Sequence, residues 1–515
     1  MRRPVNRAQK ARIQNVPAPV GGWNALDALS AMPPTDAVTL TNMFPTPSNV
    51  QVRNGSKDWA TGLGNQVNSL MAYNPASGTQ KMFAAAGGSV FDVTAGGAVG
   101  AAVIGSLTND KWQHANFATS AGPFLLMVNG ADGYYAYNGG SWQSVTSASS
   151  PLSITGVDPT TLIHVCVFAS RVWFVQKSSL KAWYLPVGQV GGAATAFDFS
   201  PIFVRGGSIV AMGVQTIDGG YGMQDQLCIV TSEGEVAVYQ GTDPSQASTF
   251  AKVGVYQLGS PMGNRCFMKY GSDLLYIGKD GLSPMSKALT STRVNSSVNL
   301  SYKIQNAISQ ATTSYASNFG WQMMLYPIGN ALILNVPVAS GQQQQYVMNT
   351  ITGAWCNFTG WKANCWERFK DQIYFGGNGV VTQAWTTAYD DNGAQINGEA
   401  LPAFNYFGTT QNKQFTMCRP VIQTSGLPGV LIGMNVDSDV TPPVGLPTFS
   451  QPTYALWDQA KWDVGIWGTD TIVKKDWQFV GAVGEMGALH MKLSVLDCSA
   501  AWVSTDYAMM DGGPI

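Results

Sequence analysis

Histidine is the side chain best suited to acid–base and metal chemistry, and the sequence contains only three: His114, His164 and His490. Each lies in a separate segment that mixes apolar and polar residues as a strand does. A zinc site needs three or four clustered ligands, and a serine triad needs a nucleophile and a carboxylate around one histidine. We therefore interpret the histidines as partly buried strand residues and expect no metal site.

Carboxylate pairs are the other common source of chemistry, and they are sparse here. Glu233 and Glu235 flank a predicted turn, and Asp390 and Asp391 lie in a predicted loop, where we expect solvated side chains. A glycosidase needs two carboxylates that face each other across a cleft, and the sequence offers no identifiable pair. Walker A, G-x-G-x-x-G, G-x-S-x-G, H-E-x-x-H and sialidase Asp-box motifs do not occur. The sequence thus predicts no catalytic residue, no cofactor and a protein that is not an enzyme.

Three tryptophans, Trp457, Trp462 and Trp467, follow one another at a spacing of five residues. WD-repeat tryptophans recur instead at a period of about 40 residues. The three rings are suited either to stacking against a sugar or to packing in a core or an interface. We favour packing and take them as interface candidates.

The seven cysteines include no C-x-x-C pair. Their odd number and scattered positions are typical of small buried side chains in a reducing compartment. They are Cys166, Cys228, Cys266, Cys356, Cys365, Cys418 and Cys498.

The first 20 residues have the composition of a basic, flexible arm. No apolar segment follows the basic residues, so we do not expect a signal peptide, and no apolar run is long enough for a membrane-spanning helix. The arm is either disordered or ordered against a neighbouring subunit or an acidic partner. Its basic residues, which are further interface candidates, are Arg2, Arg3, Arg7, Lys10 and Arg12.

Composition indicates a large globular protein with few charges. Of 515 residues, 45% are hydrophobic but only 11% are charged, whereas ordinary soluble domains contain about 25% charged residues. We favour a surface that is covered by other subunits, although a monomer with an uncharged polar surface remains the alternative. The net charge of −1 provides no global basic field that would attract nucleic acid.

The residues above must be positioned by short strands and tight turns. Residues 345–385 alternate segments of four to seven apolar or aromatic residues with Gly, Asn and Asp, as a β-meander does. The pattern Gly-x-Trp-x-x-(Val or Phe)-Thr occurs at Trp142 and again at Trp355.

Opening strands of similar meanders recur at intervals close to the roughly 40 to 50 residues of a propeller blade. A ring of blades leaves no long strand edge exposed. We therefore predict an all-β fold with a β-propeller of six or seven blades, one of them completed by a strand from the N-terminal lead-in. The opening strands are predicted at 67–70, 112–117, 162–168, 209–214, 265–270, 321–326 and 363–366.

Three regions are predicted along the chain. Residues 1–60 form the basic arm and an extended lead-in, because their prolines disfavour a helix. Residues 61–389 form the propeller, with an inserted helix near 301–315 that has Ile304, Ala307, Ile308 and Ala311 on one face. Residues 390–515 form an antiparallel β-sandwich-like domain. Its strands are predicted at 403–407, 416–423, 430–436, 477–483, 488–495 and 500–503.

Several short segments of this sequence together resemble the tail nozzle (hub, or packaged-DNA stabilisation) proteins of short-tailed bacteriophages, the podoviruses. The resemblance touches all three regions and rests on packing and turn patterns with no catalytic core. The segments are Met32-Pro33, Asp36-Ala37-Val38, Asn42-Met43-Phe44-Pro45, Val52-Arg53-Asn54-Gly55, the helix from Ile304 that leads to Trp321, Gly353-Ala354-Trp355 and the run from Trp457 to Trp467.

The resemblance implies a structural virion protein that is assembled in the bacterial host cytoplasm and located in the viral tail. Such a protein forms a ring, expected to be a homohexamer, below the portal and the adaptor (head-to-tail connector) ring. The ring continues the DNA channel, helps to retain packaged double-stranded DNA and passes it during ejection. It carries or adjoins tail fibres and a needle or plug.

Two other functions stay open from the sequence. A phage receptor- or glycan-binding propeller of the tailspike kind would bind or cleave host polysaccharide, and the scarcity of carboxylates disfavours the cleaving form. A cellular scaffold propeller would bind peptides across its top face and stay monomeric.

Overall fold

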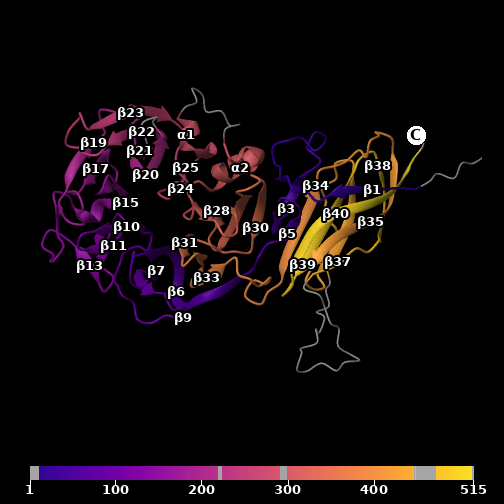
Figure 1. Cartoon of the computed structure of the whole chain (residues 1–515), viewed down its shortest axis with the longest axis horizontal. Coiled ribbons are helices and arrows are strands. Elements are labelled where there is room, and N and C mark those ends of the chain that lie inside the picture. Colours follow the sequence, from indigo (N-terminus) through magenta and orange to yellow (C-terminus); the bar gives the residue numbers. More distant parts are fainter. Residues whose placement is uncertain (1–10, 219–222, 290–298, 446, 448–470, 513–515) are drawn as a thin grey trace, which may run out of the picture.

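The computed structural model describes residues 11–218, 223–289, 299–445, 447 and 471–512, and β-strands dominate it. A ring of small sheets occupies one side of the molecule and an elongated sandwich occupies the other (Figure 1). The predicted all-β fold, a propeller joined to an antiparallel β-sandwich, is confirmed.

Seven antiparallel units follow one another around the ring within the described residues. The first strand of each unit contacts the first strand of the next, and the series returns to its start. These innermost strands overlap the seven predicted opening strands. They are β6 (Ser56–Tyr73), β10 (Gln113–Thr119), β15 (Leu162–Phe168), β20 (Ile209–Asp218), β24 (Phe267–Tyr270), β27 (Gln322–Tyr326) and β31 (Cys365–Phe369).

The outer strands of the units are short and apolar, and turns join them. The second strands are β7 (Lys81–Ala86), β11 (Gly122–Val128), β16 (Arg171–Gln176), β21 (Met223–Thr231), β25 (Asp273–Gly278), β28 (Ala331–Ala339) and β32 (Gln372–Gly376). The third are β8 (Ser89–Asp92), β12 (Tyr134–Tyr137), β17 (Lys181–Tyr184), β22 (Glu235–Gly241), β26 (Gly281–Pro284), β29 (Gln342–Asn349) and β33 (Asn378–Ala384). The fourth are β13 (Trp142–Val145), β19 (Thr195–Asp198), β23 (Phe250–Gln257) and β30 (Trp355–Thr359), and two-residue strands are β9 (Gly97–Ala98), β14 (Ile154–Thr155) and β18 (Gly192–Ala193).

The long strand β6 closes the ring. Its first half pairs with β33 of the last unit, with Ala60 opposite Val381, and its second half pairs with β7 of the first unit, with Leu70 opposite Ala84. The first half of β6, which continues from the lead-in, therefore completes the last unit, as predicted. Both sheets meet in one strand, so opening the ring requires breaking a full ladder of backbone hydrogen bonds.

The predicted helix near 301–315 is also present. The helix α2 (Gln305–Tyr315) follows a 3₁₀ turn at Tyr302–Ile304, and a further short helix is α1 (Met285–Ala288). Ile304, Ile308 and Ala311 are buried, as the helical spacing predicts. Beside them the Lys303 ammonium lies 2.9 Å from the fully buried carboxylate of Asp36 and thereby ties the helix to the lead-in.

The sandwich consists of two sheets, and the apolar core between them continues into the sixth and seventh propeller units. One sheet contains β35 (Lys413–Thr424), β37 (Ile472–Lys474), β38 (Gln478–Gly484) and β40 (Ala500–Asp511), and the other contains β34 (Ile396–Pro402), β36 (Gly429–Val436) and β39 (Gly487–Val495). Five of the six predicted strands match these elements. The strand predicted at 403–407 is wrong, because the backbone turns there, with a positive φ of 50° at Phe407, while the side chains of Phe404 and Phe407 stay buried.

The strands of the lead-in pair with strands of the sandwich. It forms β1 (Arg12–Pro17), β2 (Gly22–Trp23), β3 (Asp36–Thr41), β4 (Met43–Pro45) and β5 (Val50–Val52), of which β1, β4 and β5 extend the sheet of β40. The arm is thus ordered from β1 onward, with Arg12 opposite Met509, and residues 12–17 are not the flexible segment that the composition suggests.

A nine-stranded sheet connects the two parts of the molecule. β3 pairs on one side with β30 of the sixth propeller unit and on the other side with β34 of the sandwich. Thr41 is the shared position, with Asn357 and Glu399 as its partners. The propeller and the sandwich are therefore joined by strand pairing and not by a linker.

Candidate functional site

The axis of the propeller is crossed by Arg265, which precedes β24 of the fifth unit. One of its terminal nitrogens donates to Ser69 Oγ at 2.9 Å and to the carbonyl of Asn68 at 3.0 Å, both in the first unit. The same nitrogen donates to the carbonyl of Trp112, and the other donates to Gln322 Oε1 at 3.2 Å. Burial lowers the pKa of Arg265 from its usual value. Arg265 thus fastens together units on opposite sides of the ring.

A second contact lies across the same ring. His114 Nε2 of β10 lies 3.1 Å from Glu367 Oε2 of β31, so the second and seventh units meet over the first. With Arg265, this pair makes side-chain contacts across the ring between units that are not neighbours. Double-stranded DNA, whose major groove alone is about 12 Å wide, cannot pass along this axis.

An open cavity of about 490 Å³ lies at this end of the axis. Two cations lie near the ring of Phe319 there, with the Lys111 ammonium 4.7 Å and the Arg265 guanidinium 5.2 Å from the ring centre. Amide side chains line much of the remaining wall, including Asn109, Asn129, Asn264 and Asn318. The cavity suits a polar or anionic group better than an apolar one.

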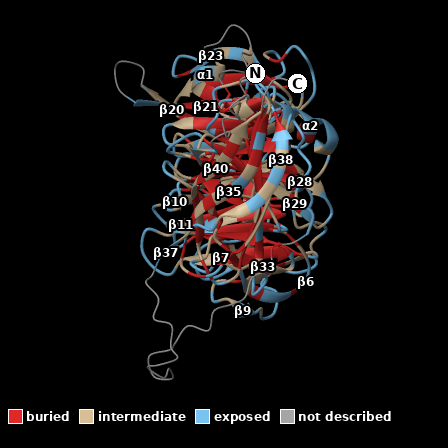
Figure 2. Ribbon diagram, turned by 90° about the vertical axis from the view of Figure 1, so that its right-hand side faces the viewer, coloured by how far each residue is buried: buried red, intermediate tan, exposed pale blue. Residues whose placement is uncertain are grey.

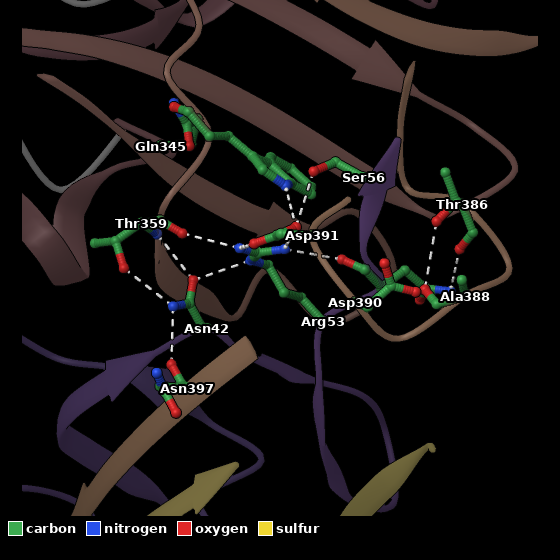
Figure 3. A network of polar contacts seen from close by, with 12 residues as sticks. Asn42, Arg53, Ser56, Gln345, Thr359, Thr386, Ala388, Asp390, Asp391 and Asn397 are labelled. Atoms are coloured by element: carbon green, nitrogen blue, oxygen red, sulfur yellow. Dashed lines mark hydrogen bonds and ion pairs between the residues drawn. The ribbon is translucent and has the colours of Figure 1, made fainter. Parts of the chain in front are cut away.

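A second polar centre holds the propeller, the lead-in and the sandwich together (Figure 3). The side chain of Arg53 is 1% exposed and forms a bidentate ion pair with Asp391, with N–O distances of 2.9 and 2.6 Å. Its remaining N–H groups donate to Asn42 Oδ1, to the carbonyl of Asn54 and to the carbonyl of Thr359. The guanidinium also lies 4.5 Å from the ring centre of Trp361.

Asp391 is saturated with donors in the same network. Its Oδ1 accepts from Ser56 Oγ at 2.9 Å and from the Trp361 indole at 3.2 Å. Our expectation that Asp391 is a solvated turn residue is therefore wrong. Glu235, expected to be a solvated residue beside a turn, is buried as well, and its carboxylate accepts from the backbone N–H groups of Val204 and Arg205. Both carboxylates have a structural role that sequence spacing does not reveal, because their partners lie far away along the chain.

The three histidines lie on different strands, β10, β15 and β39, as the sequence indicates. His490 is buried, and its Nε2 lies 2.9 Å from Glu399 Oε1, which lowers the pKa of Glu399. His164 has a buried Nδ1 without a hydrogen-bond partner, and burial lowers its pKa to about 4. In the part of the chain that the structure describes, no three His, Cys, Asp or Glu side chains are grouped to hold a metal ion.

All seven cysteines are free thiols, and six of them are buried while Cys166 is half-buried. Burial raises the pKa of Cys166 and Cys365 to about 12, so their reactive thiolate forms are suppressed. These positions agree with the prediction that the cysteines serve as small buried side chains.

One interface candidate, Arg12, falls within the described residues. Its guanidinium donates to the carbonyl of Phe407 at 2.8 Å and lies 3.2 Å from Asp511 Oδ1, so it contacts its own chain. The other candidates, Arg2, Arg3, Arg7, Lys10, Trp457, Trp462 and Trp467, lie outside the described residues.

A search for membrane-spanning helices among the described residues finds none that is sufficiently long and apolar. The sequence matches no protein-family model and no curated protein.

Solved structures with similar folds include BBS1N in complex with ARL6DN, from crystals soaked with lead or mercury, and YCF48 bound to D1 peptide. The lead-soaked BBS1N chain is 11% identical over 65% of this chain and 99% of its own length, with a TM-score of 0.42. The mercury-soaked chain is 10% identical over 64% and 97%, with a TM-score of 0.39. YCF48 is 11% identical over 69% and 99%, with a TM-score of 0.40.

Proposed function

We propose that this chain is a structural virion protein, the tail nozzle subunit of a short-tailed bacteriophage. Six copies form a ring below the portal and the adaptor ring. The ring continues the DNA channel, helps to retain the packaged DNA and passes it during ejection, while tail fibres and a needle or plug adjoin it. The protein is assembled in the bacterial cytoplasm and remains in the tail of the virion.

The observation that carries the proposal is the nine-stranded sheet that runs from the propeller into the sandwich. Domains joined by a linker move relative to each other unless they share a large apolar interface. Here β3 belongs to both parts, and Arg53 and Asp391 fasten the same junction. Such a junction suits a subunit that transmits load between a viral head and its tail.

Because side chains cross the propeller axis, we propose that the DNA channel lies between the subunits. Arg265, His114 and Glu367 occupy the axis of each propeller, so DNA passes through the opening that the ring encloses. The charged content of 11% also suits this role, because a channel with few cations lets DNA slide without gripping its phosphates.

A virus with a disrupted gene for this chain tests the proposal. Its particles should contain portal and adaptor but no nozzle, and the packaged DNA should become sensitive to nuclease. Wild-type protein supplied from a plasmid should restore nuclease-resistant, infectious particles. Infectious particles without the chain would contradict the proposal.

A second candidate function, binding of a receptor glycan, is favoured by one cavity. It has a volume of about 770 Å³ and lies beside the junction, with Trp385 and Tyr326 in its wall. The amides of Gln372, Gln383 and Asn392 lie alongside, and aromatic rings with amide groups are suited to bind sugars. A host-polysaccharide binding and cleavage assay with the purified protein tests this candidate.

A further inference from the structure

The sandwich sheet that contains β35 carries a row of apolar residues from one edge to the other. Phe479 of β38 is opposite Met417 of β35, Met417 is opposite Ala508 of β40, and Ala508 is opposite Ile13 of β1. Residues directly opposite each other lie on the same face of a sheet, so the four form one row. Figure 2 shows this side of the sandwich, which faces away from the propeller.

The two ends of this row are its most exposed members. The side chain of Phe479 is 80% exposed and that of Ile13 is 64% exposed, whereas Met417 between them is 36% exposed. An isolated exposed apolar residue is common on protein surfaces. This row differs from such isolated residues because its exposed ends lie on the two opposite edge strands of one sheet. It therefore places apolar groups where another strand would pair.

Both edge strands are open among the described residues. β38 pairs with β35 and β1 pairs with β40, and neither has a further strand partner there. Natural proteins usually protect sheet edges with charged residues or prolines. The residues of β38 include neither, although its register is irregular around Gly481. β1 contains one of each, Arg12 and Pro17, at its two ends, and Ile13 to Val16 between them are uncharged. An uncharged edge of this kind is suited to accept a strand from another chain.

Strand direction determines how two copies can join. β38, β35, β40 and β1 lie side by side in that order, and each pair is antiparallel. β1 therefore runs opposite to β38, and β1 of one copy placed against β38 of the next continues the alternation. This contact joins two different surfaces, and repetition of such a contact closes a ring when the rotation between copies allows it.

We propose that β1 of one copy pairs with β38 of a second copy, so that the sandwich sheets form a continuous sheet between neighbouring subunits. Ile13 of one copy then lies next to Phe479 of the other, and the apolar row continues across the contact. Closure of this contact into a ring rests on the proposed nozzle function. The contact itself depends only on the two edge strands of the sheet.

The neighbouring row favours this contact because its charges are already paired. Arg419 donates to Asp506 Oδ2 at 2.7 and 2.9 Å, and Asn15 donates to Asp506 Oδ1 at 2.7 Å. Pairing with a second copy consequently buries no uncompensated charge, which is the costly case at interfaces.

Cysteine cross-linking tests the register of the contact. Within one subunit, Ile13 and Phe479 are three strand spacings apart, about 14 Å, which is too far for a disulfide. The double variant I13C/F479C should therefore form a ladder of covalent oligomers on a non-reducing gel, while each single variant should not. Dimers of F479C alone at the level of the double variant would show that β38 pairs with itself and would overturn the proposal.

A charged residue introduced into the edge strand β38 tests how much this contact contributes to self-association. Phe479→Lys should weaken self-association by at least about tenfold, because a lysine replaces a central apolar contact. The matched control is Ile351→Lys, which changes a 65% exposed residue on the propeller and should leave association unchanged. Light scattering over a concentration series gives the oligomer mass of each variant. Equal association of wild type and Phe479→Lys, or a wild type that stays monomeric throughout the series, would overturn the proposal.

The outcomes separate this contact from the proposed function. If rings form but the double cysteine variant gives no cross-linked ladder, the proposed nozzle function would stand and the contact between β1 and β38 would be excluded. If the double cysteine variant is cross-linked into a ladder but the protein forms only filaments or open dimers, the contact between β1 and β38 would be established. That contact would then no longer support the proposed nozzle ring.

Discussion

Arg53, Asp391 and Arg265 have the residue types of an ordinary protein surface, yet they lie at the centres of buried polar networks. Asp391 lies 338 residues from Arg53, Arg265 donates to residues 57 to 197 positions away, and the partners of Glu235 lie about 30 positions away, so no local spacing marks these side chains. A buried ion pair with complete hydrogen bonding costs little, whereas removal of one partner leaves an uncompensated charge. The expectations for Asp391 and Glu235 were wrong for this reason, while the structural interpretation of the three histidines agreed with their positions.

Asp391→Asn should destabilise the protein by about 3 kcal/mol, since Arg53 would stay buried without its counter-charge. Asp92→Asn provides the control, because the Lys81–Asp92 pair is about one-third exposed on both sides and such pairs contribute about 1 kcal/mol or less. Urea unfolding of both variants measures the difference. Equal losses of stability would show that the junction network does not fasten the two parts of the molecule.

His164 should make the stability of the propeller depend on pH. Its pKa is about 4 in the folded protein and about 6.5 in an unfolded chain. Between these values the unfolded chain binds a proton that the folded chain does not, so the free energy of unfolding falls as the pH drops from about 6.5 towards 4. At pH 5 the loss should be about 1 to 2 kcal/mol relative to pH 7.

His164→Gln removes the titrating group and should reduce this loss. Urea unfolding of the wild type and the variant at pH 7 and pH 5 gives the four free energies that are needed. If acid destabilises both proteins equally, His164 is not the group responsible.

At the scale of elements, the pattern of short apolar segments and Gly, Asn and Asp turns predicted all seven inner strands and the helix α2. The same pattern could not predict that β1 pairs with β40 or that β3 lies between β30 and β34. Strand pairing across nearly the whole chain leaves no periodicity in sequence. The strand expected at 403–407 shows the opposite failure, because apolar spacing alone cannot distinguish a strand from a buried turn.

Two deletion variants should distinguish the contribution of the basic arm from that of strand β1. Deletion of residues 1–10 removes Arg2, Arg3, Arg7 and Lys10 but leaves β1 paired with β40, so the midpoint of thermal unfolding should not change. Deletion of residues 1–17 removes β1 as well, which uncovers the edge of β40 and should lower the midpoint.

Tail assembly, followed by electron microscopy, is the functional measurement for the shorter deletion. We propose that the arm orders against the adaptor ring or a neighbouring subunit, and we therefore expect tail assembly to be weakened. Tails that assemble normally without residues 1–10 would show that the arm has no such role.

At the scale of the whole molecule, a closed propeller and a sandwich share one sheet, so strand pairing joins the two parts. Side chains cross the propeller axis, which leaves the space between subunits as the route for DNA in the proposed nozzle. The low charge of the chain and the uncharged edge strand β38 both favour association with further copies. Assembly is consequently the property on which the account depends.

Negative-stain electron microscopy, with mass by light scattering, tests this central claim most directly. The protein is examined alone and mixed with the portal and adaptor complexes of the phage to which we propose it belongs. The account predicts rings of about six subunits with a central hole in at least one of these samples. Monomers in both samples would contradict it and would direct attention to the cavity beside Trp385 as a candidate glycan site.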